Sequence, residues 1–436
     1  MVFDPLGTAG APSREGHQPM KATDRGSGRH HLRSDAEPAG PRHGHGHGHG
    51  PAPPASRRVR ILLVAVLVPV ALATLVGLWL TWPSDTPRSG VDIGFGQQPV
   101  HGEVLAATSA SCSASAEDGE ANKCISLDVQ LTDGDSPGVT IQQVLPDEPS
   151  TPRFTVGDRV VLAYTGGDPS ESGSYQVQDF QRGASMLWLV ALFAAAVLLL
   201  GRWRGLASLT ALGFSFLVLA VYLFPAILTG ADPVIVGVLA ASVIMFGVLY
   251  VTHGVSARTS SAVLGTVLSL ALIGVLGIAF SAATRLTGLD DDTGNLIRVL
   301  GQGVDARGLL LAGMIIGALG VLDDVTVTQT SAVWELRRAN PALGTRALYT
   351  AALRIGRDHV SSAVNTLALA YAGAALPVLL TFALSGQNFG TLITAQNVAQ
   401  EVVRTLVGSI GLVAAVPITT AIAAVVARQD DIDSAA

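Results

Sequence analysis

The stretch LLLAGMIIGALGVLDDVTVTQTSAVWELRR, residues Leu309 to Arg338, decides the fold class of this chain. Its first half is apolar enough for the hydrocarbon core of a membrane, and the closing tryptophan and arginines are typical of an interfacial anchor. As one helix, the stretch predicts a transmembrane span over residues 308–334 that carries two adjacent carboxylates, Asp323 and Asp324. Lipid penalises a charged side chain at such a depth, so these groups need protein or water around them.

Polar residues recur through the second half of this stretch at intervals of four, three and four residues: Asp324, Thr328, Ser331 and Glu335. At about 100° per residue they form a stripe about 60° wide on a helix, which we expect to face other protein or water. An alternative interpretation ends the span at Leu322 and leaves the aspartates among the cytoplasmic headgroups. That helix would be about 21 Å long, which is short for a span. A further variant breaks the helix near Asp323.

The composition of the whole chain also indicates a membrane protein. Of its 436 residues, 14% are charged and 49% are hydrophobic, and the mean hydropathy is +0.46. A soluble chain of this length needs more charge to cover its surface. Apolar blocks of about twenty residues recur, the length that crosses a hydrocarbon core of about 30 Å. We therefore predict an all-α polytopic membrane protein with about eight spans: 61–82, 186–201, 206–228, 234–252, 260–283, 308–334, 361–384 and 403–427.

The distribution of arginine orients these spans. Arginines concentrate in alternate loops, most densely over 337–357, whereas an opposite loop carries the acidic run 290–292. By the positive-inside rule both termini are cytoplasmic. The predicted organisation is then a disordered His-, Gly-, Pro- and Arg-rich tail over 1–60, a retained signal anchor over 61–82, an extracytoplasmic β domain over 83–184, a seven-helix transmembrane domain over 185–428 and a cytoplasmic tail over 429–436.

The outer segment 83–184 carries the patterns of β-strands. ISLDVQL (125–131) alternates apolar and polar residues, and GVTIQQVL (138–145) and FTVGDRVVLAY (154–164) resemble further strands, the last with a turn or bulge at Gly157-Asp158. Four to six short strands in this length predict a small OB-like barrel or a sandwich. The segment is acidic and would repel phosphates, so we expect no nucleic-acid partner.

The two cysteines of the chain, Cys112 and Cys124, both lie in this outer segment. An oxidising compartment favours a disulfide that closes a hairpin, over a metal site built from two cysteines alone. In the N-terminal tail, histidines occupy every second position of HGHGHGHG: His43, His45, His47 and His49. Such imidazoles can bind Zn²⁺, Ni²⁺ or Cu²⁺, but the same tract also arises as neutral low-complexity sequence.

Ionisable groups and prolines occur in the last two predicted spans as well. Asp358, His359 and Asn365 open the seventh span, and Glu401 and Arg404 open the eighth. The Glu401–Arg404 pair either belongs to a substrate pathway or is a plain salt bridge at a helix end. Pro377 and Pro417 interrupt the two spans in similar apolar contexts. Paired broken helices are typical of a transport site, and the alternative is an ordinary packing kink.

Two segments resemble the YibE/F-like family of bacterial multi-spanning membrane proteins. They are LDDVTVTQTSAVWELRRANP (322–341) and EVVRTLVGSIGLVAAVPITT (401–420), and the most specific pattern is DD-x-T-x-x-Q-x-S-x-x-x-E-L over Asp323–Leu336. The resemblance extends over about 94–428. It implies a bacterial inner-membrane protein with an extracytoplasmic N-terminal domain. It implies no activity, because the family is defined by its membrane sequence, and the His-rich tail is not part of its pattern.

The leading functional hypothesis is a secondary transporter or permease for a small solute or ion. Asp323, Asp324 and Glu335 would bind a cation or carry protons, and the last two spans would complete the pathway. The alternative is a membrane sensor or assembly scaffold that transports nothing. Its β domain would bind an envelope partner and the loop 337–359 a cytoplasmic protein. The lipid bilayer is the remaining expected partner.

A membrane-embedded enzyme is the least favoured class, and we predict that the chain is not an enzyme. Adjacent aspartates on one helix point about 100° apart, which hinders joint activation of one water molecule. A metal-dependent hydrolase would need histidines nearby, and only His253 and His359 are candidates. The sequence contains no P-loop, GxSxG, HExxH or GxGxxG motif, and it indicates no cofactor.

Overall fold

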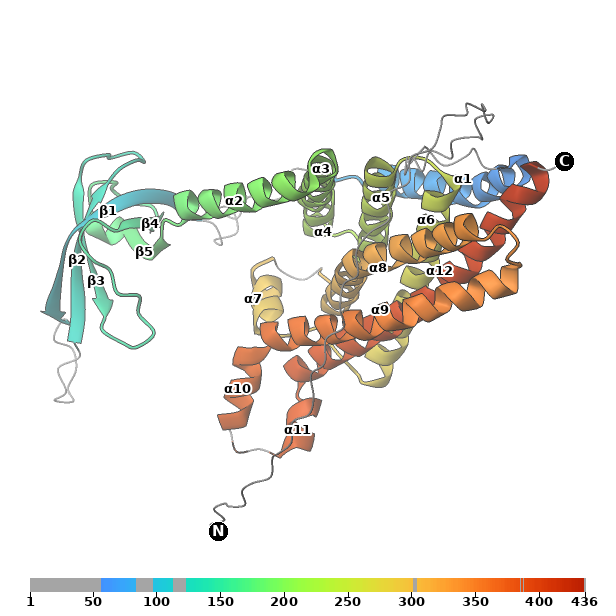
Figure 1. Ribbon diagram of the computed structural model, residues 1–436. Helices are drawn as coiled ribbons and strands as arrows, with labels where there is room; N and C mark the ends of the chain where they lie inside the picture. The colour runs from blue at the N-terminus through green and yellow to red at the C-terminus, as the bar shows by residue number, and fades with distance from the viewer. Residues whose placement is uncertain are drawn as a thin grey trace, which may run out of the picture. The chain divides into compact units, whose positions relative to one another are not determined.

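The computed structural model describes residues 56–83, 97–112, 123–300, 304–384, 386 and 388–434. These residues form a small β domain and a set of long helices (Figure 1). The tail that carries His43, His45, His47 and His49 lies outside the described residues, so a metal site there stays a prediction.

The β domain is a single antiparallel sheet with strand order β3-β2-β1-β4-β5. Its strands are β1 Gln98–Ser111, β2 Lys123–Leu131, β3 Thr140–Pro146, β4 Arg159–Tyr164 and β5 Tyr175–Phe180. The long strand β1 pairs with β2 on one side and β4 on the other, and a bulge between Val104 and Ala106 bends it. The single bent sheet is thus a half-barrel. Of the two predicted shapes, it agrees with the OB-like barrel and not with the sandwich.

Contacts between the two edges of the sheet narrow the opening of this half-barrel. The N–H of Gln142 donates to Oγ of Ser172 at 2.9 Å, and Nε2 of Gln143 donates to the Ser172 carbonyl at 2.7 Å. Inside, alternate strand residues such as Val104 and Leu127 are fully buried. This burial pattern follows from the period-two alternation in the sequence.

The turn before β4 and the hairpin of β1 and β2 have the local features that the sequence indicates. Gly157 adopts a φ of +91°, and the carboxylate of Asp158 accepts the Thr155 N–H at 2.7 Å, which fixes the turn. Cys112 and Cys124 form a disulfide with a Cα–Cα distance of 5.3 Å. It joins the end of β1 to the start of β2.

Seven helices in the described part are long and apolar enough to cross a membrane. They are α1 Arg57–Leu80, α2 Gly183–Gly201, α3 Trp203–Val218 with its continuation through η2 Leu219–Leu223 and α4 Phe224–Leu228, α5 Pro233–His253, α6 Ala257–Ala283, α8 Ala306–Ala339, and α12 Gln396–Ser434. Each lies at a predicted span. The prediction of a polytopic helical membrane protein with a small β domain is therefore confirmed.

The predicted span 361–384 has different bounds in the structure. It is divided between α9 Thr345–Ala374 and α10 Leu376–Leu384, with the interruption at Ala375. The helix α9 begins sixteen residues earlier than expected, and its first half carries Arg354, Arg357 and Asp358, which lower its hydropathy. The short helices α7 Asp291–Leu300 and α11 Phe389–Thr394 lie in the flanking connections.

Local capping explains where several membrane helices begin. The carboxylate of Asp232 accepts the N–H groups of Val234 and Ile235 at 2.8 and 3.0 Å, next to Pro233 at the first position of α5. Ser256 and Asp305 cap α6 and α8 in the same way. These side chains satisfy amides that have no partner within the helix.

The helix α8 packs against α5, α6, α9 and α12 (Figure 1). Close approach between α6 and α12 depends on glycine. A Cβ added at Gly265 would lie 2.3 Å from Oγ1 of Thr419, and one added at Gly411 would lie 2.1 Å from Cγ1 of Ile273. Small residues of this kind let membrane helices pack closely, since lipid supplies no hydrophobic drive for helix association.

Candidate functional site

The helix α8 is continuous through the paired aspartates, so the variant with a break near Asp323 is wrong. Whether the membrane span ends at Leu322 stays a prediction, since a continuous helix can extend beyond the hydrocarbon core. The buried side of its second half consists of Leu322, Val325, Thr326, Gln329, Thr330 and Val333. The predicted stripe therefore lies away from the helix core, and its two terminal side chains, Asp324 and Glu335, are 73% and 63% exposed. Protein does not enclose this stripe, because α8 makes its protein contacts mainly through the buried side, which carries both apolar and polar residues.

The two aspartates have different surroundings. Oδ1 of Asp323 is buried and has no hydrogen-bond partner among the described residues. Oδ2 of Asp324 lies 3.5 Å from Nε2 of His359 on α9, which is an ion-pair distance and longer than a normal hydrogen bond. Adjacent positions on a helix point about 100° apart, so the two carboxylates have different neighbours. An oxygen of Asp323 is buried within the protein, whereas Asp324 is largely exposed and lies beside His359 of α9.

The remaining stripe residues belong to the cytoplasmic half of the predicted orientation. Ser331 accepts a hydrogen bond from Nη2 of Arg258 on α6 and donates to the Val327 carbonyl at 2.6 Å. Glu335 lies 3.6 Å from Nη1 of Arg338 on the same helix. These groups therefore have charged or polar partners of their own, and Thr328 is half-buried.

A buried polar layer connects α6, α8 and α12, and the sequence analysis did not single it out. Oγ1 of Thr266 and Oγ1 of Thr326 lie 2.9 Å apart, and Oγ1 of Thr420 donates to Oε1 of Gln329 at 2.9 Å. Thr326 and Gln329 are the T and Q of the DD-x-T-x-x-Q pattern, at the i, i+3 spacing that puts two side chains on one helix face. The i, i+3 spacing of these two residues, on the side of α8 opposite the acidic stripe, is the sequence signal from which this layer could have been predicted.

The helix α9 approaches this layer through a glycine. A Cβ added at Gly356 would lie 2.4 Å from Nε2 of Gln329 and 2.6 Å from Cγ1 of Val416. The same Nε2 is buried without a hydrogen-bond partner among the described residues. Gly356 therefore brings the backbone of α9 against the polar layer.

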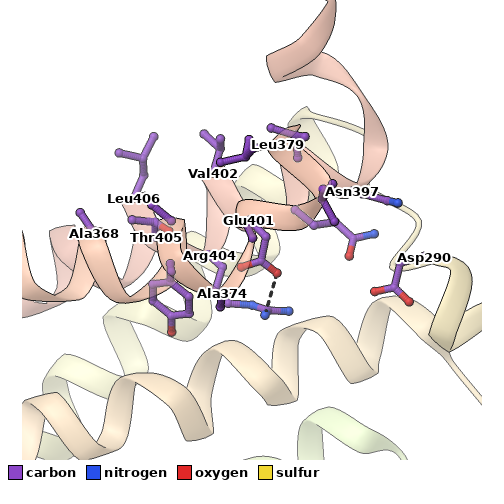
Figure 2. A pocket seen from close by; sticks show the side chains of 16 residues that line it. Asp290, Ala368, Ala374, Leu379, Asn397, Glu401, Val402, Arg404, Thr405 and Leu406 are labelled. Atoms are coloured by element: carbon purple, nitrogen blue, oxygen red, sulfur yellow. Dashed lines mark hydrogen bonds and ion pairs between the residues drawn. The ribbon is translucent and has the colours of Figure 1, made fainter. Parts of the chain in front are cut away.

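A cavity of about 640 Å³ lies between α9–α10 and the start of α12 (Figure 2). Near its centre Nη1 of Arg404 lies 2.9 Å from Oε1 of Glu401, and the two side chains are 27% and 30% exposed. Asp290, from the connection after α6, contributes a further carboxylate. Nε of Arg404 is buried and has no partner within the described part of the chain. The cavity thus places charged groups beside the interruption of α9 and α10.

The other predicted residues are not gathered at one site. Asp358 and Asn365 are exposed on α9. Pro377 is the second residue of α10, and its neighbour Val378 lines the cavity. Pro417 does not break its helix: α12 continues through it, because one lost backbone hydrogen bond is tolerated where neighbouring helices pack. The matched interruption expected at the two prolines is therefore present at only one of them.

The described residues contain no group of three or more His, Cys, Asp or Glu side chains that could hold a metal ion. His253, at the end of α5, lies with its Nδ1 2.7 Å from Oγ1 of Thr252.

A comparison with family models matches residues 189–429 to the model described as YibE/F-like protein. Comparisons with curated proteins and with solved structures give no match. The matched range begins inside α2 and covers the later helices, including both resembling segments. It does not include the β domain, so it is shorter than the resemblance over 94–428. Since the match covers more than half of the 436 residues, this chain belongs to the YibE/F-like family of multi-pass membrane proteins.

Proposed function

We propose that this chain is a secondary transporter that moves a small solute or ion across a bacterial cytoplasmic membrane. The cavity at the interruption of α9 and α10 is the observation that carries the proposal. It contains the Glu401–Arg404 ion pair within the helical domain. Charged groups are costly within a membrane and mark substrate or ion pathways, and interrupted helices often line such sites.

The paired aspartates supply a second element of this proposal. Two adjacent carboxylates repel each other when both are charged, and they relieve that repulsion by binding a cation or a proton. Asp323 has a buried oxygen without a partner among the described residues, and Asp324 faces His359. In our proposal this cluster carries a proton as the coupling ion, and the cavity carries the solute. The proposal requires no enzymatic step.

Flux measurements in proteoliposomes test this function. The purified full chain is reconstituted with the pH indicator pyranine inside, and gradients of Na⁺, K⁺, Mg²⁺, Zn²⁺, phosphate and an amino-acid mixture are imposed in turn. At least one gradient should drive a change of internal pH with the wild-type protein. Asp323→Asn and Asp324→Asn should each reduce that rate at least tenfold, and the double variant should abolish it.

The matched control is Asp135→Asn, which removes an exposed carboxylate from the β domain and should leave the flux unchanged. Folding of each variant is checked by its elution as a single species in detergent. Equal rates for wild type, both single variants and the double variant would end the role of the aspartates. If the wild-type protein moves none of the solutes in the panel, transport itself is contradicted.

A further inference from the structure

The cavity between α9–α10 and α12 has two ends of opposite electrostatic character. Ala372 and Ala374, in its wall, belong to the last turn of α9, where the carbonyls of Tyr371 and Gly373 accept the Ala375 N–H and those of Ala372 and Ala374 lie beyond the reach of donors within α9. Asn397 and Val398, also in the wall, belong to the first turn of α12, where amide groups lack them. A helix C-terminus favours a positive group, and a helix N-terminus favours a negative one.

The charged side chains of the cavity repeat this arrangement. Arg404 offers a guanidinium with a buried Nε that bonds to nothing described, and Glu401 and Asp290 offer carboxylates. Glu401 and Arg404 pair with each other at 2.9 Å but remain partly exposed, so each has further bonding capacity toward the cavity. An inorganic cation would pair with the carboxylates alone, and an inorganic anion would pair with the guanidinium alone.

Most of the rest of the wall is apolar, and its other polar residues are Tyr371, Asn397, Gln400 and Thr405. Figure 2 shows Asn397 and Asp290 at one end of the cavity, the Glu401–Arg404 pair near its centre, and Ala368 and Leu406 at the other end. A volume of about 640 Å³ is far larger than one hydrated-ion site requires and falls within the range of small organic ligands. The ligand should therefore combine a charged head with an apolar body.

We propose that this cavity binds a small zwitterion with an apolar body, of the class of hydrophobic amino acids. The carboxylate of the ligand would bind to Arg404 and the amides of α12, its ammonium group to Glu401, Asp290 and the last carbonyls of α9, and its body to the apolar wall. This inference rests on the proposed transport function and names the substrate class for it.

Equilibrium binding to the full chain in nanodiscs tests the class, with three probes of one shape. L-Phenylalanine is the zwitterion, phenylalaninamide lacks the negative charge, and 3-phenylpropanoate lacks the positive one. Phenylalanine should bind at least tenfold more tightly than either analogue, because each analogue leaves either the carboxylates or the guanidinium of the cavity without a ligand group of opposite charge. Equal or tighter binding of an analogue, or no binding of phenylalanine, overturns the proposal.

Variants of the pair locate the binding site. Glu401→Gln should weaken the binding of phenylalanine and phenylalaninamide at least tenfold and leave the affinity for 3-phenylpropanoate within threefold. Arg404→Gln should weaken the binding of phenylalanine and 3-phenylpropanoate at least tenfold and leave the affinity for phenylalaninamide within threefold. The control is an ion pair at i, i+3 spacing at the end of the β domain: Asp179→Asn and Arg182→Gln should change no affinity. Ala372→Trp keeps both charges and fills the cavity, so it should abolish binding even if the charge variants fold poorly.

The binding and flux measurements separate the two proposals. Phenylalanine bound by the cavity without any flux in proteoliposomes contradicts transport and keeps the site. Flux of another solute without phenylalanine binding keeps transport and overturns the zwitterion site. Unchanged phenylalanine affinity in Ala372→Trp overturns the location of the site.

Discussion

Gln329 illustrates how a polar side chain can lie inside the helical domain. Its side chain is fully buried, its Oε1 accepts from Thr420, and its Nε2 lies where Gly356 leaves room. The two N–H groups of Nε2 have no acceptor among the described residues, and buried donors without partners cost free energy, so the surrounding helices must hold the side chain in one geometry. Asp324, on the same helix, is largely exposed and so avoids the free-energy cost of burying a charged group inside the protein. The burial of α8 thus favours groups that can bond across helices over groups that carry charge.

Gly356→Ala should destabilise the protein. The new methyl group would lie 2.4 Å from Nε2 of Gln329 and 2.6 Å from Val416, and overpacking of this kind costs about 1–3 kcal/mol. The free energy of unfolding in mixed detergent micelles measures the effect. Gly373→Ala, on the same helix α9 with open space around its position, serves as the control and should be neutral. A stability loss equal to that of the control would contradict close packing at Gly356.

The hydroxyl pair Thr266–Thr326 should show energetic coupling. Either Thr→Val substitution leaves a buried hydroxyl with one partner fewer and should cost about 1 kcal/mol. The double variant removes both hydroxyls and should cost less than the sum of the two single variants. Unfolding of the four proteins in a double-mutant cycle gives the coupling. Strict additivity would show that the 2.9 Å contact contributes nothing.

At the scale of elements, sequence periodicity predicted most of the architecture. Runs such as 234–252 are apolar on all sides and identify a span without ambiguity, and the alternation in 125–131 identifies β2. The bounds of α9 were wrong because hydropathy marks only its second half, whereas the helix also includes the arginine-rich residues before it. The interruption at Ala375 was expected near Pro377, but the same reasoning failed at Pro417. A proline alone does not show whether neighbouring helices support a continuous backbone.

The candidate site was harder to predict, for a physical reason. We expected the polar stripe of α8 to face other protein or water, since lipid penalises such groups. The protein buries a different face of the helix, which carries Val325, Val333 and Gln329. Which face is buried depends on where α6, α9 and α12 pack, and no single helix contains that information. The cavity at Glu401 and Arg404 likewise needs α9, α10 and α12 together.

The β domain should lose local stability in acid through one carboxylate. Burial alone would raise the pKa of Asp133, but hydrogen bonds from the backbone N–H of His101 at 2.6 Å and from its ring Nδ1 at 2.5 Å outweigh it and hold the pKa below its ordinary value. A lowered pKa stabilises the fold above the unfolded pKa of about 3.9. That stability is lost as the pH falls through the lower folded value.

Hydrogen exchange of β1 in the full chain measures this loss. Protection of residues 98–104, corrected for the intrinsic effect of pH, should fall in wild type below about pH 4. Asp133→Asn should be less protected at neutral pH and nearly insensitive to acid in this range. Asp135→Asn, two residues along, should behave as wild type. An acid response of the Asp133→Asn variant equal to that of wild type would assign the effect to another group.

At the scale of the whole molecule, the orientation in the membrane is a prediction from arginine placement, and it is open to a direct test. Single cysteines are introduced at Ser136, in the β domain, and at Asn340, after α8. The native cysteines form a disulfide and should not react. With an impermeant maleimide, S136C should react in intact cells, whereas N340C should react only after permeabilisation. The opposite pattern would invert the orientation, and equal reaction at both sites would contradict an odd number of spans between them.

The helix α2 contains no buried residue, and among the helices it packs mainly on α3, which follows it directly after Arg202. Selection on α2 should then act through its length and its hydrophobicity alone. We expect that a bland leucine–alanine run of nineteen residues, the length of α2, can replace it with normal yield and folding. The same exchange in α8 should yield no folded protein, so two spans of one chain would tolerate drift to very different degrees.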